Sequence, residues 1–309
     1  MIQFIVVAVC IALVFASILL VVASERKKNR SAPFVEKTLR SPGYSLSQKI
    51  DLLTNEALDV LLVLFIIPAI DLFAYSTLQP GFWLAVILIA SVIIFLFLLS
   101  KLTTLYKKIR DFRLGLDGEI YTGQELNYLM REGAWVYHDI PYKYGNIDHI
   151  VVSKGGIYCI ETKSVRKPHD EKGKKEVRVK VADNSIIFPH MRTKEPVTQA
   201  QTHVEHLSKH LLNKTGVEFP VFPVIALPGW YVDIDETKKR GFYVMNPKRG
   251  SFLSKYLKDE RIPKDKLTLA NRIIESDARD VQSNADMTDP NGRKKYSFFL
   301  KRKKSDAKF

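Results

Sequence analysis

Residues 147–163 read Ile147-Asp148-His149-Ile150-Val151-Val152-Ser153-Lys154-Gly155-Gly156-Ile157-Tyr158-Cys159-Ile160-Glu161-Thr162-Lys163. Two runs rich in β-branched residues flank a pair of glycines, which predicts two antiparallel strands joined by a tight turn. A loop at residues 154–155, or over all of residues 153–156, places Asp148 opposite Glu161. A loop at the two glycines places Asp148 opposite Lys163 instead, with Glu161 diagonal to it. In every case the three side chains share one face, because Glu161 and Lys163 are two residues apart on a strand.

The apolar surroundings of these charged side chains indicate a functional site rather than a solvated strand face. A Glu-x-Lys tripeptide alone usually marks a solvated strand face, but both faces of this hairpin are otherwise apolar. Such strands lie inside sheets, where an unpaired charge costs several kcal/mol. Directly opposed side chains have Cβ atoms about 5 Å apart, close enough for two carboxylates to hold one cation. The hairpin therefore predicts a divalent metal site formed by Asp148 and Glu161, with the ammonium group of Lys163 beside it.

Length and composition limit the class of protein. The 309 residues have room for one or two domains, and the formal charge of +14 favours an anionic partner, either nucleic acid or an anionic membrane leaflet. The cysteines Cys10 and Cys159 are far apart, which excludes a disulfide framework and fits a reducing cytosol. The sequence contains no P-loop, Rossmann glycine pattern or serine nucleophile elbow, and so gives no support to nucleotide-driven or acyl-transfer chemistry.

Three apolar runs predict an integral membrane protein. Residues 1–23 are long enough to span a bilayer, and they lack the basic start of a cleaved signal peptide, so we expect a retained transmembrane helix. Residues 58–100 contain two further runs joined by a polar turn at residues 76–81, which predicts a transmembrane helical hairpin. Asp71 is the one carboxylate well inside these runs. It lies near the outer end, where interfacial hydration is a better explanation than an ion path.

Basic residues predict the orientation. Lysine and arginine are abundant at residues 25–30 and in the juxtamembrane linker 101–115, whereas the turn at residues 76–81 has none. By the positive-inside rule the turn and the N-terminus lie outside, in a membrane such as that of a bacterial cell. Residues 24–57 then form a cytosolic connector, and everything after Lys101 is cytosolic.

The cytosolic part alternates between helix and strand patterns. We expect, in order, a helix capped by Asp117, a strand at 136–140, the hairpin, a charged loop at 167–180 leading to an edge strand, a helix from Glu195 to Gly216, strands at 221–227 and 242–245, and a helix at 267–281. This order indicates a mixed sheet with helices on both faces. We assign residues 116–262 to one domain and residues 263–309 to a C-terminal helix and basic tail. The tail is predicted to be disordered, with contact to lipid headgroups or phosphate as the functional alternative.

Three histidines lie on one stripe of the helix that begins at Glu195. They are His203, His206 and His210, and their spacing of three and four residues could place imidazoles around zinc. Because the sequence offers no cysteine or carboxylate trio nearby to complete such a site, we predict a solvated face instead.

Several motifs occur in an order that resembles a known family. They are Asp117-Gly118-Glu119, Gly123-Gln124-x-Leu126, Tyr137-His138-Asp139-Ile140-Pro141, Asn146-Ile147-Asp148-His149, Gly156-Ile157-x-x-Ile160-Glu161-Thr162-Lys163, Gln199-Ala200, Phe219-Pro220-Val221-x-Pro223-Val224 and Pro228-Gly229-Trp230. Together they closely resemble the NERD (nuclease-related) domain, a branch of the restriction-endonuclease-like PD-(D/E)xK superfamily. The resemblance covers about residues 115–250 and leaves out the membrane segments and the tail.

The resemblance implies an α/β fold, with a mixed central sheet flanked by helices and here preceded by three transmembrane helices. It also implies a hydrolase of phosphodiester bonds that uses Mg²⁺ or Mn²⁺. Asp148 and Glu161 would hold the metal, Glu119 would approach it from the first helix, Lys163 would position or activate water, and Gln199 would support the site. Carboxylate oxygens are the ligands that Mg²⁺ prefers. The chain departs from the superfamily pattern at Ile147, where proline is expected before the metal-binding aspartate.

Three functions are consistent with these observations. The first is a membrane-anchored cytosolic nuclease that acts on DNA or RNA. The second is a catalytically silent nuclease-like module that binds nucleic acid or a protein partner at the membrane. The third is an assembly scaffold in the membrane, which we rank last because a scaffold needs no charged residues inside a sheet. The sequence leaves open the choice between DNA and RNA and the oligomeric state.

Overall fold

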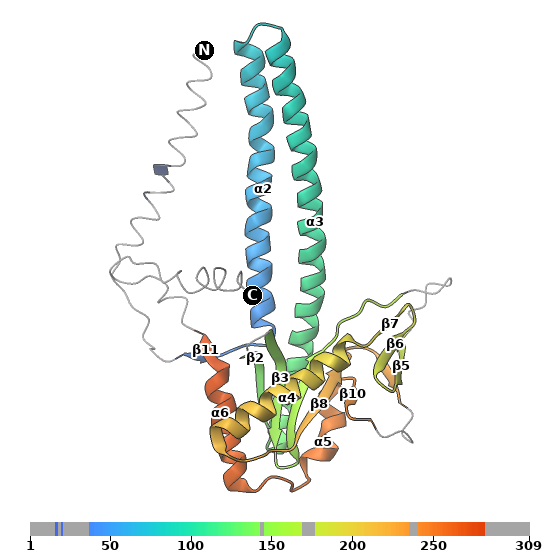
Figure 1. Ribbon diagram of the computed structural model, residues 1–309. Helices are drawn as coiled ribbons and strands as arrows, with labels where there is room; N and C mark the ends of the chain where they lie inside the picture. Colours follow the sequence, from blue (N-terminus) through green and yellow to red (C-terminus); the bar gives the residue numbers. More distant parts are fainter. Residues whose placement is uncertain are drawn as a thin grey trace. The chain divides into compact units, whose positions relative to one another are not determined.

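The computed structural model describes residues 16–17, 20, 37–142, 145–168, 177–234 and 240–281 (Figure 1). Residues 39–278 form one compact unit, and the two ends of the chain form another. The helix expected at residues 1–23 lies outside the described residues, apart from Ala16, Ser17 and Leu20, which are helical. The basic tail beyond Val281 lies outside them too. The described chain also has two short strands, β1 (Thr38–Leu39) and β11 (Arg279–Val281).

Two long helices form an antiparallel hairpin (Figure 1). They are α2 (Tyr44–Thr77) and α3 (Phe82–Leu126). Both are long and apolar enough to cross a membrane, and most of the large apolar side chains at residues 58–99 are exposed. The two apolar runs predicted within residues 58–100 are therefore helical, as expected, although both helices extend well beyond them.

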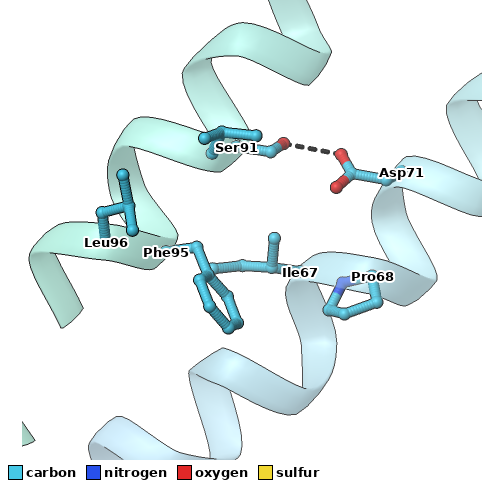
Figure 2. A pocket seen from close by; sticks show the side chains of 7 residues that line it. Ile67, Pro68, Asp71, Ser91, Phe95 and Leu96 are labelled. Atoms are coloured by element: carbon cyan, nitrogen blue, oxygen red, sulfur yellow. Dashed lines mark hydrogen bonds between the residues drawn. The ribbon is translucent and has the colours of Figure 1, made fainter. Parts of the chain in front are cut away.

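Asp71 of α2 faces the other helix of the hairpin. Its Oδ1 accepts a hydrogen bond of 2.6 Å from the hydroxyl of Ser91 on α3, beside a small pocket lined by Pro68 and Phe95 (Figure 2). The contact satisfies one oxygen of this acid within the apolar part of the hairpin, where a polar group without a partner would be costly.

The helix expected to begin at Asp117 is in fact the last part of α3, which is 45 residues long. The basic segment 101–115 is helical as well, and continuous with it. The sequence predicted a new helix at this point, but α3 is continuous, and Gly118 allows another segment of the chain to pack closely against it. A Cβ atom at Gly118 would collide with the hydroxyl of Ser164, and one at Gly123 would lie 2.5 Å from Cγ of Pro42. The helix tolerates these glycines because they let neighbouring segments pack against it.

The central sheet has the strand order β10-β8-β4-β3-β2. Its strands are β2 (Trp135–Tyr142), β3 (Gly145–Ser153), β4 (Gly156–Thr162), β8 (Val221–Ala226) and β10 (Tyr243–Met245). Strand β3 is antiparallel to β2 and β4, whereas β4, β8 and β10 are mutually parallel. Ser153 pairs with Gly156, so the loop is Lys154-Gly155, and the same register puts Asp148 opposite Glu161. This is the first of the two predicted registers.

Helices cover both faces of the sheet, as predicted. One face packs on α4 (Glu195–Thr215) and α6 (Lys264–Ala278), in a core that includes Ile150, Cys159 and Leu207. The other face packs on the end of α3 and on two short segments, η1 (Asn127–Glu132) and α5 (Ser251–Leu257). A short 3₁₀ turn, η2 (Lys248–Gly250), precedes α5. The charged face of the hairpin, with Asp148 and Glu161, therefore lies on the side of α4.

A second, smaller mixed sheet has the order β7-β6-β5-β9. Its strands are β5 (Arg178–Ala182), β6 (Ser185–Phe188), β7 (Met191–Thr193) and β9 (Tyr231–Asp233). It packs on the start of α4 and on β8 through Trp230 and Val197. The sequence predicted one edge strand here, because strands of three to five residues carry too few side chains to show a period.

Candidate active site

Asp148 and Glu161 lie side by side at one end of the β3–β4 pair. The Oδ2 atom of Asp148 accepts a hydrogen bond of 2.8 Å from the backbone N–H of Thr162, which ties this carboxylate to β4. Glu161 is buried, with 8% of its surface exposed. Repulsion from Asp148 adds to burial in raising the pKa of Glu161 well above its ordinary value. The two carboxylates are thus close enough to affect each other's charge, as the sequence predicted.

Glu119 reaches the same place from α3. It is 8% exposed, and the backbone N–H of Gly43 donates a hydrogen bond to its carboxylate. Burial, and after it repulsion by Asp148, raises the pKa of Glu119 to about 9. Burial likewise raises the pKa of Asp148 to about 7, although the Thr162 hydrogen bond acts in the opposite direction. The three predicted acids, Glu119, Asp148 and Glu161, therefore form one electrostatic group, which we call the acidic cluster.

Two lysines lie near the acidic cluster. Lys163 follows β4 directly, and its Nζ is 2.9 Å from Oε2 of Glu195, the first residue of α4. Lys49, on α2, is exposed, and its charge acts on Glu119 and Asp148. Within the described part of the chain, no lysine or arginine forms an ion pair with a member of the acidic cluster. The cluster's charge is left largely uncompensated.

Helix α4 supplies Gln199 and His203 from adjacent turns of one face. The Nδ1 atom of His203 lies 3.4 Å from Oε2 of Glu161. His203 is 4% exposed, and burial lowers its pKa to about 4, so the ring is neutral near pH 7. Gln199, one turn earlier on that face, has a buried Oε1 atom with no hydrogen-bond partner. The oxygen of Gln199 is therefore available to a ligand or a water in the site.

The prediction of a solvated histidine face was wrong for His203. This ring packs edge to face against Tyr142, with centroids 5.2 Å apart. His206 and His210 are half-buried, and Nε2 of His210 lies 2.8 Å from Asp277 on α6. His203 is therefore enclosed by protein, whereas His206 and His210 contact both protein and water.

A fourth acid, Asp139, was missed as a site residue although it lies in one of the quoted motifs. It is 3% exposed and adopts a left-handed backbone conformation, with φ of 52°, which aspartate tolerates better than most residues. Its carboxylate accepts hydrogen bonds from Arg40 at 2.8 Å, Ser45 at 2.6 Å and Asn146 at 3.3 Å. Burial raises the pKa of Asp139, while Ser45 and Arg40 act against that rise.

The donors to Asp139 come from unexpected parts of the chain. Arg40 and Ser45 belong to the start of α2 and the segment before it, which the sequence indicated only as a connector. No local pattern marks them, because only the folded chain brings residue 40 next to residue 139. The base of the α2–α3 hairpin is thus part of the site's surroundings.

The acidic cluster fits a hard divalent cation by its chemistry. In the described residues no three His, Cys, Asp or Glu side chains are already gathered at metal-binding distance. Carboxylates that repel one another relax apart, and a cation would draw them together. Three acids with raised pKa values and the unpartnered Gln199 oxygen offer only oxygen donors, which suits Mg²⁺ or Mn²⁺.

A mixed sheet with helices on both faces, and acids at the end of one hairpin with a lysine just beyond, defines a domain of the restriction-endonuclease-like class. Residues 114–228 match the NERD family, described as the nuclease-related domain. The chain therefore carries a nuclease-related domain, as the motifs indicated. No curated protein and no solved structure matches the chain.

Proposed function

We propose that this protein is a membrane-anchored, Mg²⁺- or Mn²⁺-dependent nuclease that hydrolyses phosphodiester bonds of DNA or RNA on the cytosolic side of a membrane. The observation that carries the proposal is the acidic cluster. Three buried or partly buried carboxylates interact electrostatically and their pKa values are raised. Among the described residues, no lysine or arginine forms an ion pair with them. An uncompensated cluster of this kind is costly to fold, and so is typical of a site that binds a cation. The match to a nuclease-related domain supports the same reading.

The cluster's residues have distinct roles in this proposal. Asp148, Glu161 and Glu119 would hold the metal, which when bound polarises the phosphate and stabilises the charge of the transition state. Lys163 carries its ammonium group beside the cluster, held by Glu195, and positions or activates the attacking water. Gln199 accepts a hydrogen bond from that water through its free oxygen. Neutral His203 limits the movement of the Glu161 carboxylate.

The membrane anchor in this proposal is the α2–α3 hairpin, together with the apolar segment at residues 1–23. Lys101 of α3 pairs with Glu56 of α2 at 2.9 Å, just outside the apolar part of the hairpin. The basic residues that follow favour the cytosolic side for this end of α3, and the uncharged turn at residues 78–81 favours the outside. The partners are then a lipid bilayer and nucleic acid, and the net charge of +14 suits both.

A second candidate is the catalytically silent module that binds nucleic acid or a protein partner at the membrane. One observation favours it: the Nζ atom of Lys163 is already engaged by Glu195, so the lysine is not free to act as a base. This candidate predicts salt-dependent binding of nucleic acid that is unaffected by chelator.

The test uses the full chain, purified in detergent, with single- and double-stranded DNA and RNA in Mg²⁺, Mn²⁺ or chelator. We expect cleavage that requires the metal and is lost in Asp148→Asn. The matched control is Asp265→Asn, an exposed aspartate on α6 far from the cluster in sequence, which should cleave normally. Absence of cleavage with either metal, or equal cleavage by Asp148→Asn, refutes the nuclease and leaves the binding module.

A further inference from the structure

A groove lies on the edge of the central sheet that also carries the acidic cluster. Strands β4, β8 and β10 are parallel, so their carboxyl ends meet at one edge. The cluster and Lys163 are at the end of β4. A groove of about 640 Å³ follows the ends of β8 and β10, and it is lined by Trp230, Tyr231, Asn246, Phe252 and Lys255, among others. Ligands of open α/β sheets bind outside these strand ends.

Aromatic rings and cations alternate in and around this groove. Tyr231 is 61% exposed, and the guanidinium carbon of Arg178 lies 5.2 Å from its ring centroid. The Nζ atom of Lys255 lies 4.7 Å from the centroid of Phe252. Lys167 is 5.5 Å from the ring of Trp230. Among the described residues, the lining contains the cation Lys255 and one carboxylate, Asp233. Arg178 and Lys167 add two cations at the rings of lining residues, so the groove suits a polyanion with flat apolar groups.

The groove is continuous with the chain that leaves the cluster. Nε1 of Trp230 donates to the backbone oxygen of Val165 at 3.3 Å, and Nζ of Lys167 donates to that of Gly229. Lys167 is four positions after Lys163, a distance of at most about 14 Å along an extended chain. A ligand that reaches the acidic cluster can therefore extend into the groove.

We propose that this groove binds a single-stranded segment of nucleic acid that continues from the acidic cluster. Bases stack on Tyr231 and Phe252, while phosphates contact Arg178 and Lys255. Exposed aromatic faces interleaved with cations are how proteins hold unpaired strands, because every base presents a π-face for stacking. In a duplex these faces are covered by neighbouring base pairs. This inference rests on the proposed function and narrows its substrate to single-stranded nucleic acid.

The experiment measures binding by the full chain in detergent, with chelator present to prevent cleavage. The probes are a fluorescent thymidine oligonucleotide, the same strand in a duplex, and an oligoglutamate peptide. We expect Tyr231→Ala to weaken binding of the single strand about ten-fold, a typical effect of losing one stacked base, and Tyr231→Phe to restore it. Lys255→Ala should weaken binding and reduce its salt dependence.

A matched control exists on η1, where Arg131 lies 5.3 Å over the ring of Tyr128, which is also exposed. Tyr128→Ala removes an equivalent arginine–tyrosine pair outside the groove and should bind normally. Equal weakening by both alanine variants overturns the proposal. Tighter binding of the duplex than of the single strand, or equal competition by the peptide, overturns it as well.

A second readout separates this inference from the nuclease itself. Hydrolysis of bis(4-nitrophenyl) phosphate with Mn²⁺ reports the cluster alone, because this small diester is too short to occupy the groove. Tyr231→Ala should leave this hydrolysis unchanged while weakening oligonucleotide binding. Loss of binding in Tyr231→Ala without hydrolysis in any variant supports the groove and refutes the nuclease. Hydrolysis with unchanged binding in Tyr231→Ala refutes the groove and leaves the nuclease standing.

Discussion

Two neighbouring acidic sites differ in the groups that surround their carboxylates. Asp139 is surrounded by donors, with Arg40, Ser45 and Asn146 all at its carboxylate. In the acidic cluster, Glu161 has a neutral imidazole beside it, and the pKa values of its acids are raised by burial and by one another. Both sites flank the same strand pair, since Asp139 is on β2 and Asp148 on β3.

This difference distinguishes an acid that stabilises the fold from acids that are available to bind a cation. A buried acid that the protein supplies with donors stabilises its surroundings only while the donors stay in place. An acid without a paired cation, whose pKa is raised by burial even where a backbone N–H donates to it, weakens the fold and stabilises it only when a ligand binds. Asp139 is therefore expected to hold the base of the hairpin to the sheet, and the cluster to hold a cation. The following predictions test that contrast, beginning with the largest effect.

Replacing Glu161 by glutamine should abolish activity without weakening the fold. The change removes a metal ligand, so cleavage should fall by about 1,000-fold or more, equivalent to about 4 kcal/mol in the barrier. Burial and Asp148 already raise the pKa of Glu161 well above its ordinary value, so a neutral amide resembles the protonated side chain and the metal-free protein should be no less stable than the parent. Cleavage assays and thermal unfolding measured on the same preparation check both halves. If Glu161→Gln unfolds more easily than the parent, then Glu161 stabilises the fold, as Asp139 is expected to do.

Replacing Asp139 by asparagine should have the opposite effect on stability and weaken the fold. It removes the carboxylate charge that pairs with Arg40 at 2.8 Å in a partly buried place, which should lower the free energy of unfolding by about 3 kcal/mol. Denaturant unfolding of this variant, of Arg40→Gln and of the double variant gives the coupling between the two side chains. We expect the double variant to lose less than the sum of the single losses. Additive losses would show that Arg40 and Asp139 do not act as a pair.

Magnesium should stabilise the parent protein through the acidic cluster. At about 100 times its dissociation constant a bound ligand contributes about 2.7 kcal/mol. The thermal midpoint, followed by tryptophan fluorescence, should rise with Mg²⁺ in the parent and in Asp139→Asn. It should stay constant in Glu161→Gln. A rise of equal size in all three would assign the metal effect to another part of the chain.

The metal-free protein should lose stability as the pH rises. Glu119 has its pKa raised to about 9 and Asp148 to about 7, so the folded chain binds more protons than the unfolded chain above about pH 4. The stabilisation is complete below the unfolded pKa values and is lost as the pH rises toward the folded ones. The slope is at most about 1.4 kcal/mol per pH unit for each group.

The matched variant for this pH effect is Glu119→Gln, whose amide oxygen can still accept from Gly43. Its stability should vary less between pH 5 and pH 8 than that of the parent, measured without metal. An unchanged pH profile would mean that Glu119 is hydrated and charged at neutral pH.

The sequence was sufficient for the local part of the site. The glycine pair between β-branched runs correctly predicted the hairpin but left two registers open, and the structure has the one that brings Asp148 opposite Glu161. The helix pattern correctly predicted α4 over residues 195–215, whereas Gln199 was indicated only by the resemblance to the NERD domain. These inferences hold because they depend on residues close together in the chain, where spacing alone determines which side chains meet.

Long-range contacts could not be predicted in the same way. Arg40 and Ser45 reach Asp139 across about a hundred residues, and nothing in their neighbourhood marks them as site residues. The glycines of α3 were misleading for a related reason. The sequence predicted a helix start capped by Asp117, whereas the adjacent Gly118 lies within α3 and allows the close approach of Ser164, a distant residue that only the fold brings near.

The unbroken length of α3 has an electrostatic consequence. From Leu99, the end of its apolar part, to Glu119 in the cluster the helix continues for twenty residues, a rise of about 30 Å. With the apolar part in a bilayer, α3 acts as a spacer more than three times the Debye length of about 8 Å in physiological salt. The negative potential of anionic lipids has decayed at that height. In the proposed membrane-anchored nuclease, a nucleic acid would therefore approach the cluster without being repelled by the bilayer.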